Sequence, residues 1–143
     1  MPNTILVPMD GSESAMRALH LAVERARVQP QGRVHLVTVH SPLRVYGEIQ
    51  VYVGEKKAAD MAAQYNREIL EPAEQMLRSS GVAFTSSTAE GDAAEQIVEC
   101  AKAVGAGEII MGSRGLGRIA GLVMGSVTTK VVHLTQVPVT LVK

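Results

Sequence analysis

The chain has few aromatic residues, one cysteine and no excess of charge of either sign. Its 143 residues include one Phe, three Tyr and no Trp, so aliphatic side chains and Met must fill the interior. Because Cys100 is the single cysteine, an internal disulfide is excluded. Fourteen basic residues balance 14 acidic ones, and no run of Lys or Arg exceeds two. The chain therefore lacks the electrostatic footprint of a protein that binds nucleic acid or an anionic membrane surface.

Long apolar segments are also missing. No apolar run approaches the roughly 20 residues that a membrane-spanning helix needs. The first residues, MPNTILVPMD, lack the basic region and the long apolar segment of a secretory signal. We therefore expect a cytoplasmic protein with no membrane partner. The length suits one domain, residues 1–143, with a core of ordinary size.

Short apolar segments alternate with helical patterns along the whole chain. This alternation predicts a parallel sheet covered by helices on both faces, with right-handed crossovers. We expect a single-domain α/β fold, a Rossmann-like three-layer sandwich whose five-stranded parallel sheet has the order 3-2-1-4-5 and carries four helices. The strands are expected at Thr4–Met9, Arg33–His40, Val82–Thr88, Glu108–Met111 and Val137–Val142.

The helical patterns fall between these strands. Apolar residues at helical spacing predict helices around Ala15–Ala26, Ala58–Leu77, Ala93–Val104 and Ser126–Leu134. Pro72 lies inside the second of them and predicts a kink or a new helix start at that position. The segment Ser41–Glu55 is expected to be irregular, with a length that often belongs to a functional lid.

Glycine is concentrated after the fourth expected strand. Five of the 13 glycines lie between Gly112 and Gly125. In an open parallel sheet, ligands bind beyond the carboxyl ends of the strands, where Asp10 and this segment are both expected. The phosphate loop of the common nucleotide hydrolases does not fit, because no Lys followed by Ser or Thr comes after the glycines at the required spacing. The dinucleotide fingerprint is nearly matched from Gly115 to Ala120, but it should follow the first strand of the unit.

A different spacing fits better: Gly112, two residues, Gly115, nine residues, Gly125 and then Ser126. Gly112 and Gly115 would let backbone amides turn inward just after a strand. Gly125 and Ser126 would start a helix, with Ser126 as its N-cap, whose free amides and positive dipole end attract phosphate. The pattern predicts a phosphate-binding loop, and Asp10 is a candidate ligand for an Mg²⁺ ion bridging the phosphates.

With these features the sequence resembles the universal stress protein family over essentially its whole length. The matching segments are ILVPMDGSESAMRAL, HLVTVH, MGSRGLGRIAGLVMGSVTTKVV and VPVTLVK. The glycine spacing resembles the signature of the ATP-binding branch of that family. The resemblance implies that ATP is the ligand and that the protein forms a homodimer through its last strand, Val137–Val142. By our expected topology that strand is an edge, which is a template for pairing.

The resemblance also implies a set of binding residues. One group would lie beside the nucleoside, with the main chain of Val39 facing adenine. A second would line the ribose and phosphate region, and a third would cradle the phosphates. The residues beside the nucleoside are Pro8, Met9, Asp10 and Val39. Those at the ribose and phosphate region are Met111, Gly112, Arg114 and Gly115, and those that cradle the phosphates are Gly125, Ser126 and Val127.

Other interpretations stay open. Asp10, Gly11 and Ser12 also have the composition of a turn with a helix cap. No Ser–His–Asp set, general-base Glu or phosphate-loop Lys is evident, so binding rather than robust catalysis is expected. Slow ATP hydrolysis or phosphoryl transfer, AMP or a cyclic nucleotide as ligand, and a nucleotide-independent dimeric interaction module are the alternatives. Our leading hypothesis is a homodimeric stress-response regulator that responds to ATP and acts on an unidentified protein partner.

The histidines and the cysteine suggest no further site. His35 and His40 are an odd number of positions apart on one strand, so their side chains are expected on opposite faces. No histidine has a partner at metal-ligand spacing. Cys100 lies between Ile97 and Val104 on a predicted helix, which favours a buried structural thiol.

Overall fold

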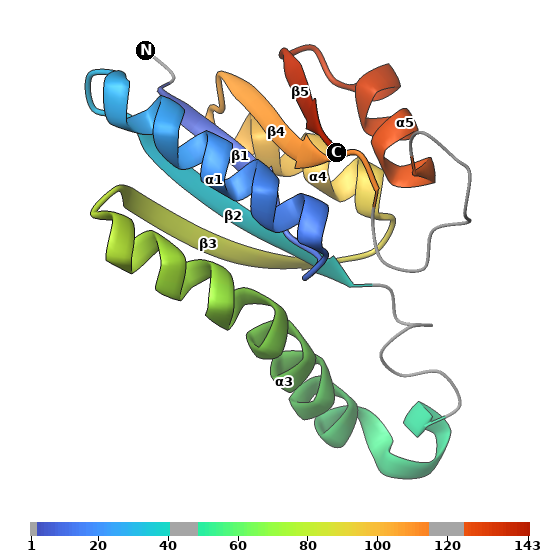
Figure 1. Cartoon of the computed structure of the whole chain (residues 1–143). Helices are drawn as coiled ribbons and strands as arrows, with labels where there is room; N and C mark the ends of the chain where they lie inside the picture. Colours follow the sequence, from blue (N-terminus) through green and yellow to red (C-terminus); the bar gives the residue numbers. More distant parts are fainter. Residues whose placement is uncertain (1–2, 41–48, 115–124) are drawn as a thin grey trace.

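The computed structural model describes residues 3–40, 49–114 and 125–143, with the backbone alone for residues 49–53 and 55. It contains one five-stranded sheet in the order β3-β2-β1-β4-β5, and every neighbouring pair is parallel (Figure 1). The predicted α/β fold and strand order are confirmed. The strands are β1 Thr4–Pro8, β2 Arg33–His40, β3 Ala83–Glu90, β4 Glu108–Gly112 and β5 Val139–Val142. The helices of the described residues are α1 Glu13–Val28, α3 Ile49–Ser80, α4 Ala93–Val104 and α5 Ser126–Leu134.

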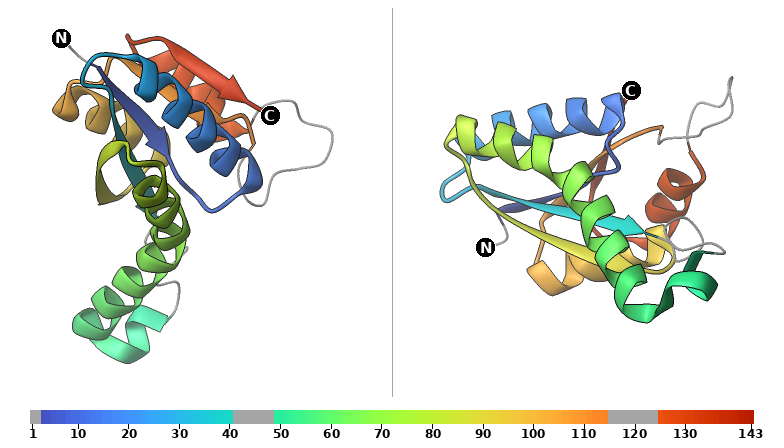
Figure 2. Two further views of the ribbon diagram at one scale, coloured as in Figure 1. Left: turned by 60° about the vertical axis from the view of Figure 1, so that its left-hand side comes forward. Right: turned by 90° about the horizontal axis from the view of Figure 1, so that it is seen from below.

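Helices cover both faces of the sheet. In Figures 1 and 2, α1 and α3 lie over one face, and α4 and α5 lie over the other. Successive strand residues supply the two sides, because side chains alternate across a strand. Ile5 and Val7 belong to the apolar cluster under α1 and α3, whereas Leu6 belongs to the cluster under α4 and α5. The central strand β1 is therefore buried on both faces, as its continuous apolar run predicts.

Local capping signals explain the helix ends that the sequence predicted well. The side chain of Ser12 caps α1, and the carboxylate of Asp92 caps α4 by accepting from the amide of Glu95 at 3.0 Å. Helix α4 ends at Gly105, whose left-handed backbone (φ 65°) suits glycine. The observed bounds of α4 match the predicted ones because both ends carry such a signal.

Helix α3 differs from the prediction at its beginning. It starts at Ile49, so residues 49–55 of the segment expected to be irregular belong to a helix, while residues 41–48 lie outside the described residues. The break in helical geometry lies at Gly54 (φ 80°, ψ 171°), a backbone conformation that glycine adopts readily. The helix does not restart at Pro72. Buried Leu70 and Leu77 pack on the core on either side of that proline and keep the helix continuous across it.

Candidate functional site

The turn after β1 is built by its own side chains. The amide of Ser12 donates to Oδ1 of Asp10 at 2.9 Å, and Gly11 between them has φ +83°. Ser12 Oγ then accepts from the amide of Ala15 at 3.2 Å and caps α1. Asp10 and Ser12 thus perform the turn-and-cap role that their composition allows. The same arrangement holds the Asp10 carboxylate at the carboxyl end of the central strand.

The end of β4 docks on the first turn of α1. A Cβ placed on Gly112 would lie 2.3 Å from Ser14 Oγ and 2.8 Å from the Ala15 amide nitrogen, so this position requires glycine. Ser14 Oγ also donates to the main-chain oxygen of Arg114. Asp10 and Gly112 therefore lie at one edge of the sheet, as expected from the topology.

Helix α5 begins at the same edge without a side-chain cap. Gly125 is its N-cap, with ordinary extended geometry (φ −75°, ψ 162°) and no side-chain hydrogen bond. The Gly125 amide donates to the oxygen of Ser113 at 2.8 Å, and Thr128 Oγ1 donates to the oxygen of Gly112 at 3.2 Å. The prediction that Ser126 is the N-cap is wrong, because the bond to Ser113 holds Gly125 in the extended conformation and makes Ser126 the first helical residue. Both Ser126 and Val127 are exposed.

Lys130 on α5 forms ion pairs with residues at the beginning of α4. Lys130 Nζ lies 3.1 Å from a carboxylate oxygen of Asp92 and 3.7 Å from one of Glu95. The hydrogen bond from Lys130 to Asp92 raises the pKa of Lys130. Donation from the Glu95 amide, followed by the bond from Lys130, lowers the pKa of Asp92. Lys130 is thus committed to the contact between two helices.

The remaining expected binding residues differ in the burial of their side chains and in their main-chain hydrogen bonds. Met9 and Met111 are 2% and 4% exposed, so both side chains face the core. The Met9 amide donates to the oxygen of Val37 at 2.8 Å. Pro8 ends β1, and the half-buried Val39 side chain packs on the cluster under α4. Gly115 lies outside the described residues.

Arg114 carries a buried polar atom. Among the described residues its Nε has no hydrogen-bond partner, and neither does Oγ of the adjacent Ser113, a residue that is 4% exposed. Burial of an unpaired donor costs free energy. The main chain next to Arg114 is tied to the start of α5, because Ser113 accepts from Gly125.

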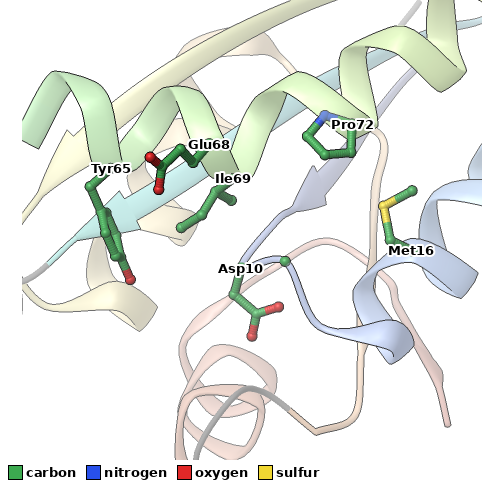
Figure 3. Close-up of a pocket in the computed structure, with 7 residues that line it drawn as sticks. Asp10, Met16, Tyr65, Glu68, Ile69 and Pro72 are labelled. Atoms are coloured by element: carbon green, nitrogen blue, oxygen red, sulfur yellow. The ribbon is translucent and has the colours of Figure 1, made fainter.

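A cavity of about 260 Å³ lies beside Asp10, between α1 and α3 (Figure 3). Four of its lining residues come from α3, for which the sequence predicts only a helix with an apolar face. Their spacing on one face of a helix, with Glu68 among apolar neighbours, is the signal that was available. The lining residues are Asp10, Gly11, Met16, Tyr65, Glu68, Ile69 and Pro72.

The two strand histidines lie on opposite faces, as predicted. His35 contacts Thr85 Oγ1 (Nδ1, 2.6 Å) and Ser87 Oγ (Nε2, 2.8 Å). Burial and then the charge of Arg33 lower the pKa of His35. His40 instead lies against α3, where its Nδ1 is 3.2 Å from Asn66 Nδ2.

Cys100 is half-buried, with Sγ 3.8 Å from Ser87 Oγ, and burial raises the pKa of its thiol. Within the described ranges, no group of three or more His, Cys, Asp and Glu side chains is placed to hold a metal ion. None of the helices described is long and apolar enough to cross a membrane.

Comparison with known proteins identifies relatives over the full length. The model of the universal stress protein family matches residues 1–143. Universal stress protein YxiE of Bacillus subtilis is 33% identical over 153 residues, and the match covers all of both chains. A universal stress protein of Thermus aquaticus, from the QAH/OAS sulfhydrylase 3′ region, is 36% identical over 149 residues with the same coverage.

Solved structures share the fold. Hypothetical protein MJ0577 superposes with a TM-score of 0.81 at 28% identity, over 98% of this chain and 94% of the other. The universal stress protein of Archaeoglobus fulgidus in complex with dAMP superposes with a TM-score of 0.70 at 27% identity, over 100% of this chain and 98% of the other. A universal stress protein in complex with cAMP superposes with a TM-score of 0.56 at 26% identity, over 97% of this chain and 94% of the other. With the family model and these relatives spanning the whole sequence, the chain belongs to the universal stress protein family.

Proposed function

We propose that this universal stress protein binds ATP at the carboxyl edge of its sheet and that nucleotide occupancy regulates a homodimer. The observation that carries the proposal is the uncapped N-terminus of α5, which β4 holds through Ser113 and Gly112. The first amides of such a helix have no partner within the helix, and together with the dipole they attract phosphate. Relatives of known structure that bind dAMP and cAMP support an adenine nucleotide as the ligand.

The phosphate end of the ligand fits the residues around α5. Ser126 and Val127 would offer main-chain amides, and Gly125, whose own amide donates to Ser113, would shape the turn before them. Arg114 is a cationic residue at the same end of β4. Gly115 completes the glycine pattern in the sequence. Asp10 would supply the one protein carboxylate that an Mg²⁺ ion bound mainly by phosphates and water requires.

The nucleoside would lie along the ends of β1, β2 and β4. There Pro8, Met9 and Met111 present main-chain groups while the two Met side chains remain in the core. The main chain of Val39 would face adenine. Recognition by main-chain groups is compatible with ATP, AMP or a cyclic nucleotide, and we propose ATP because the glycine spacing provides a place for the outer phosphates.

The homodimer is proposed to form through β5. This strand is one edge of the described sheet, next to β4, and its four residues are all partly exposed. An uncovered edge offers unpaired main-chain groups to a second strand. Because β5 pairs with β4, whose end forms the nucleotide site, occupancy and dimer contact are coupled through one strand, and an unidentified protein partner would respond to the change.

A nucleotide-independent dimeric module is the second candidate, and one specific observation favours it. Gly112 is explained by the close approach of Ser14 alone, with no need for a phosphate. That explanation does not extend to Gly125, whose backbone geometry suits many residues. The two candidates therefore make opposite predictions for a substitution at Gly125.

The deciding experiment is to denature freshly purified protein, identify any released nucleotide by mass, and titrate ATP with Mg²⁺ calorimetrically. We expect the wild type to bind ATP and Gly125→Val to bind at least tenfold more weakly while remaining folded by circular dichroism. Val28→Ala, at a position 82% exposed at the end of α1, is the control and should bind as the wild type does. Failure of the folded wild type to bind any adenine nucleotide would overturn the proposal in favour of the interaction module.

Turnover is a separate question. Incubation of the wild type with ATP and Mg²⁺ should release phosphate slowly or not at all, because no general base or phosphate-loop Lys is evident. Rapid release that Asp10→Asn abolishes would instead support the hydrolase or phosphoryl-transfer alternative.

A further inference from the structure

The cavity beside Asp10 has a size that suits part of a nucleotide. Its volume is about 260 Å³, below the roughly 300–1,000 Å³ of pockets that enclose a drug-sized ligand. It can hold a planar base, with the rest of the ligand outside. The Asp10–Gly11 turn forms one of its walls, so the cavity adjoins the proposed ligand position on the α3 side.

The chemistry of the lining favours the base over the phosphates. Met16, Ile69 and Pro72 give apolar surface, and Tyr65 adds a partly buried aromatic ring. Asp10 and Glu68 are acidic, and no Lys or Arg is among the described lining residues. A lining without Lys or Arg offers a phosphate chain no cationic partner, whereas the Glu68 carboxylate can accept hydrogen bonds from an amino group on a base.

The part of α3 that lines the cavity is also attached to the end of β2. Asn66, the residue after Tyr65, is 6% exposed and its Nδ2 lies 3.2 Å from Nδ1 of His40. His40 directly follows Val39. The stretch of α3 that forms the cavity wall is therefore attached to the strand end whose main chain is expected to face adenine.

We propose that this cavity is the base subsite of the site described above and that Tyr65 on α3 determines base affinity by stacking on the ring. The inference rests on the proposed function and adds α3 to its binding elements. Figure 3 shows Tyr65 and Ile69 projecting from α3 toward the Asp10 turn, with Met16 approaching from α1. The Glu68 carboxylate at the rim of the cavity selects bases whose edge carries an amino donor.

The test separates the base from the phosphates by using two probes, ATP and inorganic tripolyphosphate, each with Mg²⁺. Stacking of one base on an aromatic side chain corresponds to about a tenfold change in affinity or more. We expect Tyr65→Leu to weaken ATP binding about tenfold and to leave tripolyphosphate binding unchanged. Tyr65→Phe keeps the ring and should bind ATP as the wild type does, as should Gln75→Ala, an exposed position on α3 outside the cavity.

The outcomes distinguish this inference from the proposal that it extends. Gly125→Val should weaken the binding of both ATP and tripolyphosphate, because it alters the part of the site that binds phosphate. Wild-type ATP affinity in Tyr65→Leu would overturn the base subsite and leave the ATP proposal intact. Absence of ATP binding by the wild type would overturn both.

A comparison on the wild type alone requires no variant to fold. Purine riboside 5′-triphosphate lacks the 6-amino group of ATP but keeps the ring and the phosphates. We expect ATP to bind about tenfold more tightly, because Glu68 accepts from that amino group. Equal affinity for the two ligands would overturn Glu68 as the selecting residue.

Discussion

Ser14 and Gly112 lie in contact at the edge where α1 begins and β4 ends. The Ser14 Oγ occupies space only 2.3 Å from where a Cβ on residue 112 would stand. The same hydroxyl donates to the oxygen of Arg114, 100 positions away in the sequence. One hydroxyl thus holds the end of β4 against the first turn of α1, and this contact brings the Asp10 turn and the start of α5 to a common edge.

Gly112→Ala should destabilise the fold by roughly 1–3 kcal/mol, because the added methyl group meets backbone as well as side-chain atoms and forces a shift. Urea unfolding at pH 7 measures the change. Ser126→Ala, at an exposed position of the same edge, is the control and should stay within about 0.5 kcal/mol of the wild type.

Removing the Ser14 hydroxyl should rescue Gly112→Ala only in part. The amide nitrogen of Ala15 and the carbonyl carbon of Ser14 would still lie 2.8 Å from the new Cβ. Full recovery in the Ser14→Ala double variant would show that the backbone moves freely here, against the close contact described.

The stability of the protein should fall as the pH drops from about 7 toward 5, in part through His35. Burial lowers the pKa of His35 in the folded state, so the unfolded chain binds more protons below its ordinary value of about 6.5. The contribution of His35 to stability is fully present above its ordinary pKa of about 6.5. It is lost as the pH falls through the lower pKa that His35 has in the folded state.

Urea midpoints at several pH values measure this effect. His35→Gln should show a smaller loss of stability between pH 7 and 5 than the wild type does. His20→Gln, which changes an exposed histidine on α1, should keep the wild-type slope. Equal slopes for all three proteins would exclude His35 as a source of the pH dependence.

Leu141→Pro should convert the proposed dimer into a monomer. Pro138 and Val142 accept from β4 through their oxygens, so main-chain groups of alternate residues face β4 and those of Leu141 face the open edge. Proline at position 141 removes an outward amide without removing a bond to β4. Leu141→Val keeps that amide and should remain dimeric by light scattering after gel filtration; a dimeric Leu141→Pro would place the interface elsewhere.

ATP with Mg²⁺ should stabilise the wild type by mass action. At 100 times its dissociation constant a ligand adds about 2.7 kcal/mol, which raises the melting temperature of a domain of this size by about 8 °C. The shift should be much smaller for Gly125→Val at the same ATP concentration. An equal shift in both proteins would indicate that ATP binds away from α5.

Structural features with a local sequence signal are predicted well, and features that depend on distant residues are not. The bounds of α4 follow from Asp92 and Gly105, which act within a few residues of the helix ends. The beginning of α3 was missed because its pattern before Ala58 lacks a clear apolar face. Ser126 was mistaken for an N-cap because the bond that selects Gly125 comes from Ser113, a residue on β4 rather than in the helix itself.

The amino-acid sequence by itself determined the α/β class, because periodicity and capping are written in neighbouring residues, and it determined the family through the motifs that it shares with that family. Only the tertiary structure decided why residue 112 is glycine and which face of α3 walls the cavity. Those answers depend on distances between Ser14 and Gly112 and on the approach of Tyr65 to the Asp10 turn. Such distances arise when helices pack on the sheet, and no local pattern encodes them.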